Sequence, residues 1–151
     1  MIREQIKSKL VEAMKAKDEK TTGTLRLINA AIKDKDIEAR PKGITDGIDD
    51  SAILSLLQSM IKQRRESIDM YTKGGRTDLV ASEQAEIDVI QMFLPKQMSE
   101  DEVKAAIQQI VTETGASSIK DMGKVMGVLK SKYAGQLDMG KASALIKSIL
   151  G

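Results

Sequence analysis

A serine pair followed by a lysine is the pattern in this sequence that comes nearest to a nucleophilic site. Ser117 and Ser118 follow Gly115-Ala116 and precede Lys120, and a serine hydroxyl next to a base can attack an amide or ester. Such sites need backbone donors for an oxyanion, supplied by a longer glycine-rich neighbourhood than the one found here. Capping of the next helix by Ser117 or Ser118 is therefore the favoured interpretation.

Glycine and lysine at positions 123, 124 and 127 indicate a second kind of chemistry, contact with phosphate. Their spacing is not that of a Walker A loop, and no strand precedes them. On a helix, Gly123 and Gly127 share one face, where missing side chains let another backbone or a phosphate approach closely. Each glycine costs about 1 kcal/mol of helix stability relative to alanine. Packing within the protein and ligand binding both explain that cost.

Positive charge is concentrated at the end of the chain. Residues 115–151 carry six lysines against two aspartates, a local charge of +4, whereas residues 1–114 carry 18 basic and 20 acidic side chains, or −2. A phosphate-contacting surface and an ordinary solvated face both fit this pattern. The candidate nucleic-acid-binding residues are the two glycines together with Lys120, Lys124, Lys130, Lys132, Lys141 and Lys147.

Composition excludes several classes of enzyme. The chain has no histidine and no cysteine, which removes Ser-His and Cys-His pairs, zinc sites with nitrogen or sulfur ligands and thiol redox chemistry. Two clusters of carboxylates, Asp34-Asp36-Glu38 and Asp46-Asp49-Asp50, are candidates for binding a hard cation. Nearby lysines and Gly47 favour a solvated surface instead. We therefore predict no catalytic residues, no metal and no cofactor. Whether the chain is an enzyme stays open, with a non-enzyme favoured.

The hydrophobic spacing predicts an all-α protein. Apolar residues recur at helical intervals nearly throughout, and only one Phe, two Tyr and no Trp are present, which argues against a β-rich fold. Gly23 is expected in a turn or at a helix start, and residues 39–50, which include a proline and two glycines, in a loop. The predicted helices cover residues 2–14, 25–32, 49–73, 79–94, 99–115, 122–129 and the region from 138 onward.

The best domain boundary lies at Pro95. Its ring disfavours a helical conformation in the preceding residue, and Ser99 with Glu102 forms a capping box that starts a new helix. The predicted architecture is an N-terminal helical bundle at 1–94, a link at 95–98 and a smaller three-helix tail domain at 99–151. No repeat of fixed period is apparent. The charged start and the lack of a long apolar run predict no signal peptide, no membrane association and a cytoplasmic protein.

Several segments together resemble the GatB/YqeY family of small stand-alone proteins. The specific part is the Leu94-Pro95-Lys96-Gln97 link with the stretch from Asp121 to Gly127. The match covers essentially the whole chain, and its other elements are Arg26–Ile32, Arg65, Gly75–Leu79, Phe93 and Gly115–Ser117.

The resemblance implies an all-α protein similar to the C-terminal part of the GatB component of glutamyl/aspartyl-tRNA amidotransferase. In that enzyme the tail is implicated in holding tRNA. Glutamine hydrolysis is the task of a different component, and the phosphorylation step uses a large N-terminal domain for which this chain has no room. Carbon–nitrogen ligase activity with glutamine as amido-N-donor is thus not expected of this chain alone.

Three functions follow as hypotheses. The leading one is a non-catalytic accessory protein that binds tRNA or another structured RNA through residues 115–151, linked to tRNA-dependent amidotransferase in translation. The second is a component that joins amidotransferase subunits and modulates their carbon–nitrogen ligase activity. The third is a helical protein-interaction module that does not bind RNA.

Overall fold

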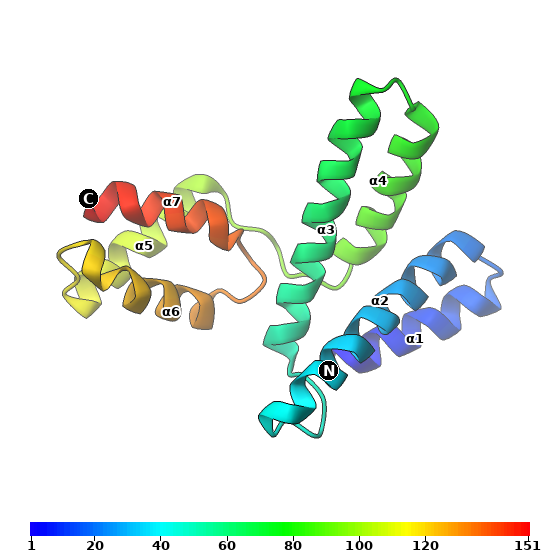
Figure 1. The fold of residues 1–151 in the computed structure, drawn as a ribbon, viewed down its shortest axis with the longest axis horizontal. Coiled ribbons are helices and arrows are strands. Elements are labelled where there is room, and N and C mark those ends of the chain that lie inside the picture. The colour runs from blue at the N-terminus through cyan, green and yellow to red at the C-terminus, as the bar shows by residue number, and fades with distance from the viewer. The chain divides into compact units, whose positions relative to one another are not determined.

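The computed structural model describes all 151 residues and contains seven α-helices, two short 3-10 helices and no strand (Figure 1). The predicted all-α class is confirmed. The chain divides into two compact units, Met1–Leu94 and Pro95–Gly151, called here the N-terminal and C-terminal units. The first holds α1 (Ile2–Lys15), α2 (Glu19–Ala39), η1 (Arg40–Lys42), α3 (Asp50–Lys73) and α4 (Thr77–Gln91), and the second holds α5 (Glu100–Thr114), η2 (Ile119–Asp121), α6 (Met122–Lys132) and α7 (Met139–Leu150).

Side-chain caps mark where two helices of the N-terminal unit, α2 and α3, begin. The Asp18 carboxylate accepts from the backbone N–H of Thr21 at 3.1 Å, and Asp49 accepts from that of Ala52 at 2.9 Å. Because Asp18 already caps α2, Gly23 lies inside this helix, and its expected place in a turn or at a helix start is wrong. A glycine there weakens the helix but does not end it, because the apolar residues that follow are buried in the core.

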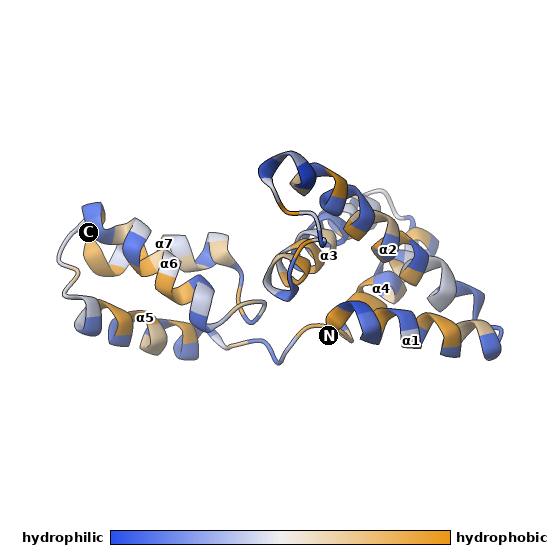
Figure 2. Ribbon diagram, turned by 90° about the horizontal axis from the view of Figure 1, so that it is seen from below, coloured by the Kyte–Doolittle hydropathy of each residue, from blue (hydrophilic) through white to orange (hydrophobic).

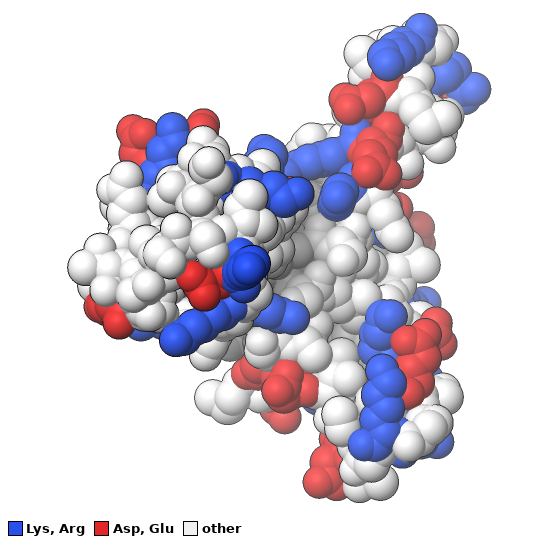
Figure 3. All heavy atoms as spheres, turned by 60° about the vertical axis from the view of Figure 1, so that its left-hand side comes forward, with Lys and Arg blue, Asp and Glu red and all other residues white.

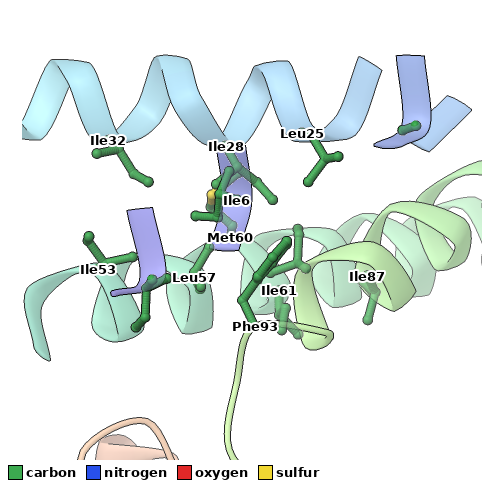
Figure 4. Packing of buried hydrophobic residues seen from close by; sticks show 13 residues of the cluster. Ile6, Leu25, Ile28, Ile32, Ile53, Leu57, Met60, Ile61, Ile87 and Phe93 are labelled. Carbon is green, nitrogen blue, oxygen red and sulfur yellow. The ribbon is translucent and has the colours of Figure 1, made fainter. Parts of the chain in front are cut away.

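The core of the N-terminal unit is built from all four of its helices. Ile6 of α1, Ile28 of α2, Leu57 of α3 and Ile90 of α4 are completely buried. Figure 4 shows this cluster of buried side chains from close by, with Phe93 and Met60 among those packed between the helices. Burial of this apolar surface is the main term that stabilises the unit.

A salt bridge fastens the loop after η1 to the helices. The Arg3 guanidinium binds the Asp36 carboxylate in a bidentate manner, with Nη1–Oδ2 and Nη2–Oδ1 distances of 2.9 and 2.6 Å. Arg3 also donates to the backbone carbonyl of Ile48 at 3.0 Å, and the Ile48 N–H donates to Asp36 Oδ1 at 2.8 Å. The pair therefore holds α1, α2 and the loop together. It also takes Asp36 out of the candidate cation group Asp34-Asp36-Glu38.

Gly47 lies against this salt bridge, and its replacement by alanine gives a first testable prediction. The φ angle of Gly47 is +93°, and an added Cβ would lie 2.6 Å from Arg3 Nη2. We expect Gly47→Ala to displace Arg3 and to lower the free energy of unfolding by about 1 kcal/mol more than Gly43→Ala does. Gly43 is the matched control, since its φ is +88° and nothing lies within 4 Å of its added Cβ. Equal losses in urea denaturation would contradict the expected clash.

Helix α5, the first of the C-terminal unit, starts at the predicted capping box. Ser99 Oγ accepts from the Glu102 N–H at 3.2 Å, and the Glu102 carboxylate accepts from the Ser99 N–H at 3.1 Å. Helix α5 ends at Gly115, whose φ of +70° is the left-handed conformation that glycine adopts most easily. Figure 2 shows hydrophobic and hydrophilic residues alternating along the ribbons, as expected for helices with one apolar side.

The residues of the predicted link contact the turn between α6 and α7. The Gln97 side-chain amide donates to the Gly135 carbonyl at 2.7 Å, and the Met98 N–H donates to the Gln136 carbonyl at 2.8 Å. These bonds lie inside the C-terminal unit. Residues 97 and 98 are thus structural parts of that unit rather than a free connection.

Candidate nucleic-acid interface

The polar groups before α6 are arranged around Asp121. Its carboxylate accepts from the backbone N–H groups of Ser117 and Ser118, at 3.0 and 3.4 Å. These backbone bonds, followed by the nearby Lys124 charge, hold the pKa of Asp121 below its usual value. Ser118 is the N-cap residue of η2. The serine pair is thus part of a helix start, with the Asp121 carboxylate as its hydrogen-bond partner.

Helix α7 begins in a similar way. The Asp138 carboxylate accepts from the N–H groups of Gly140 and Lys141, at 2.7 and 3.2 Å. Both aspartates of the basic segment therefore hold backbone N–H groups at helix starts. An acceptor at such a position is favoured by the helix dipole.

Two buried residues on each helix determine which side of it faces solvent. Val125 and Leu129 anchor α6, while Ala142 and Ile146 anchor α7, all four completely buried. They pack with Val103, Ala106, Ile107 and Ile110 of α5 and with Leu137. Because a helix has 3.6 residues per turn, positions 124, 127 and 130 of α6 and 141, 144 and 147 of α7 lie away from these anchors, and all six are exposed.

The six candidate lysines come from η2, α6 and α7. Lys120, Lys124, Lys130, Lys132, Lys141 and Lys147 are exposed. Only Lys132 has an ion pair, with Glu113 of α5 at 3.6 Å. The other five have no carboxylate within 4 Å. Called here the lysine surface, these five are Lys120, Lys124, Lys130, Lys141 and Lys147.

The structure argues against one of the two explanations of the glycines in α6, packing within the protein. A Cβ added to Gly123 or to Gly127 would meet nothing within 4 Å. Both residues are exposed, so close packing inside the chain does not explain them. Both glycines leave the backbone of α6 open to solvent, Gly123 directly before Lys124 and Gly127 between Lys124 and Lys130.

Basic residues of the N-terminal unit are arranged differently. In the Lys62-Gln63-Arg64-Arg65 run, Arg64 does not pair along its own helix, because its Nε donates to Glu86 of α4 at 2.8 Å. Figure 3 shows lysine and arginine atoms in several groups on one face of the molecule, with acidic atoms among many of them. Lysines without an ion pair also occur in the N-terminal unit, Lys7, Lys20 and Lys62 among them, so what distinguishes residues 115–151 is their excess of lysine over acidic residues.

The sequence-based list of candidate residues lacks one exposed glycine, Gly140. It is the residue before Lys141, as Gly123 is the residue before Lys124, and it is exposed in the same way. The signal that identifies it is the repeated tetrapeptide Asp-Met-Gly-Lys, which occurs at 121–124 and again at 138–141.

These features define an all-helical protein with exposed lysines on η2, α6 and α7. The chain belongs to the Yqey-like protein family, whose profile matches residues 3–150. This confirms the family resemblance found in the sequence. None of the helices has the length and apolar character that crossing a membrane requires.

Curated relatives of the chain are fungal proteins called Altered inheritance of mitochondria protein 41, mitochondrial. The Lachancea thermotolerans protein is 35% identical over 115 residues, covering 75% of this chain and 59% of that protein. The Eremothecium gossypii protein is 40% identical over 89 residues, covering 59% of this chain and 46% of that protein. The Saccharomyces cerevisiae protein is 29% identical over 133 residues, covering 84% and 69%. The chain thus spans about half to two thirds of these relatives.

The relatives correct one prediction. A cytoplasmic protein was expected, but the relatives bear names that place them in mitochondria, so the cytoplasmic assignment is wrong. The physical reason is that a charged start and the lack of a long apolar run argue only against membrane insertion. They do not distinguish one aqueous compartment from another.

Proposed function

We propose that this chain is an accessory protein that binds the phosphate backbone of tRNA or another structured RNA through α6 and α7. The observation that carries the proposal is the lysine surface, with five exposed lysines that have no carboxylate within 4 Å. Lysines of this kind attract phosphates and release counterions. They position a nucleic acid without reading its sequence.

The glycines favour a polyanion that comes close to the helix. Gly123 and Gly127 expose the backbone of α6 beside Lys124 and Lys130. A phosphodiester backbone can use such an approach. Stacking of bases is not part of the proposal, because the aromatic residues of the whole chain are one Phe and two Tyr.

In this proposal the two compact units act as separate domains, a helical bundle at 1–94 and a three-helix tail at 99–151. The tail holds the RNA and the bundle docks a partner. The family resemblance makes subunits of a tRNA-dependent amidotransferase the first partners to test. Copurification with those subunits would support the modulator hypothesis, with the carbon–nitrogen ligase activity belonging to the assembly.

The test is a titration of the purified protein with unfractionated tRNA over a series of salt concentrations. We expect the logarithm of the binding constant to fall linearly with the logarithm of the salt concentration, with a slope of about −3 to −5 for four or five phosphate contacts. Changing Lys120, Lys124, Lys130 and Lys132 to glutamine should flatten that slope by about 2 to 3. The flattening should be nearer to about 2 if Lys132, which is already paired with Glu113, contributes little to tRNA binding.

Circular dichroism of that variant shows whether it is still folded. Absence of tRNA binding by the wild-type protein at low salt would refute the proposal. Equal or tighter binding to vesicles of anionic lipid would show that the surface recognises negative charge in general rather than RNA.

A further inference from the structure

The last two helices of the chain repeat one another. The sequence Asp-Met-Gly-Lys at 121–124 recurs at 138–141, and Lys-Ser at 130–131 recurs at 147–148, each seventeen residues further on. Between them the buried positions are apolar in both copies, since Val125 matches Ala142 and Leu129 matches Ile146, and a small residue stands at both Gly127 and Ala144. Because there are only two copies, they do not make a repeat of fixed period along the chain.

The structure gives matching roles to the two copies. Helix α6 starts at Met122 and α7 at Met139, the same position in each copy. Each residue of 122–131 is compared with the residue seventeen positions later, in 139–148. In every such pair both residues are buried, both are half-buried or both are exposed. The exposed counterparts are Gly123 and Gly140, Lys124 and Lys141, Gly127 and Ala144, Lys130 and Lys147, and Ser131 and Ser148.

The two helices run in opposite directions. Figure 1 shows α6 followed by a turn and α7 running back beside it. A Cβ added to Gly151, after the end of α7, would lie 3.5 Å from Ile119 Cδ1, just before α6. The end of one helix therefore lies at the start of the other.

This arrangement divides the lysines between two ends. Lys124 from the start of α6 and Lys147 from the end of α7 lie toward one end of the helix pair, while Lys130 and Lys141 lie toward the other. Along α6 the lysines at 124 and 130 are separated by about 9 Å, at 1.5 Å per residue. Each end of the pair thus receives one lysine from each copy.

We infer that α6 and α7 form two equivalent halves of one surface for a polyanionic backbone, each contributing two phosphate contacts. Lys124 and Lys130 are the contacts of the first half, and Lys141 and Lys147 those of the second. This inference rests on the proposed RNA binding. It adds that neither helix alone accounts for the affinity and that the second copy, at 138–148, matters as much as the first.

Two paired variants test the equivalence in the tRNA titration. Lys124→Gln with Lys130→Gln removes the first half, and Lys141→Gln with Lys147→Gln removes the second. Each pair should flatten the salt slope by about 1.5, which near 0.1 M salt is a loss of affinity on the order of tens-fold. The variant with all four of these lysines changed to glutamine should show about twice that flattening of the salt slope.

The matched control removes the same charge from the same unit at other places. Lys96→Gln with Lys104→Gln changes two exposed lysines in the link and in α5, and Lys104 is already near Glu100 at 3.6 Å. We expect this pair to change the slope by less than half as much. An equal effect of the control would overturn the inference, because net charge alone would then explain binding.

The outcomes separate the two proposals. If wild-type protein binds tRNA and only the α6 pair weakens binding, the equivalence of the halves is refuted while RNA binding stands. If wild-type protein does not bind tRNA at all, the proposed function fails and the inference fails with it. Equal losses from the two pairs, with little loss from the control, would support both.

Discussion

Replacing Ile146 by alanine should lower the free energy of unfolding of the C-terminal unit by about 2 to 5 kcal/mol. The side chain of Ile146 is completely buried and packs with Ile107, Leu129 and other residues of α5 and α6. Its truncation removes buried apolar surface and leaves a cavity, and the remaining helices can close that cavity only in part. The loss is a large share of the stability of a unit this small.

Ile149→Ala is the matched control, since it makes the same change in the same helix at a position that is 36% exposed. We expect it to cost less than half as much. Native-state hydrogen exchange measured by NMR gives the comparison for each unit separately. Faster exchange in α5–α7 with unchanged exchange at buried positions such as Leu57 is the expected result for Ile146→Ala. Equal acceleration in both units would contradict their independence.

Asp36→Asn should destabilise the N-terminal unit by about 1 to 3 kcal/mol at neutral pH. The side chains of Arg3 and Asp36 are only 29% and 22% exposed, and the neutral amide cannot accept both Arg3 bonds while also accepting from the Ile48 N–H. The variant leaves a partly buried guanidinium with fewer acceptors. Urea denaturation at pH 7 measures the loss, and Asp34→Asn, at an exposed position of the same helix, is the control.

The same variant has a defined pH dependence. The hydrogen bonds from the Arg3 guanidinium are the main cause that holds the pKa of Asp36 below its ordinary value. A carboxyl with a lowered folded-state pKa adds stability that is fully present above its unfolded pKa of about 3.9. That stability is lost as the pH falls through the folded pKa. The difference between wild type and Asp36→Asn should therefore be constant from pH 7 to about 5 and shrink below about 4. A difference that stays unchanged down to pH 2 would show that Asp36 acts by packing alone.

Much of the helical structure could be predicted from local patterns. The Ser99–Glu102 capping box, the stop at Gly115 and the start near Asp138 all depend on residues within one helical turn. The exposed positions of the lysines also follow from the helical period, once buried residues such as Leu129 and Ile146 are assigned to the core.

The partners of charged side chains required the tertiary structure. Glu66 and Asp69 stand at helical spacing from the basic residues of α3, but Arg64 binds Glu86 of α4. Arg3 and Asp36 lie 33 positions apart in sequence and yet share two hydrogen bonds. A pattern within one helix cannot report such contacts, because they depend on which helices are packed together.

Local sequence patterns are sufficient to predict the all-helical class, most of the helix starts and the place where positive charge is concentrated. The folded structure was needed to show which of those lysines lack a carboxylate partner and that Gly123 and Gly127 face open space. The physical reason is the range of the interactions. Helix periodicity and capping act within a few residues, whereas packing and ion pairing depend on groups that folding brings together from distant parts of the chain.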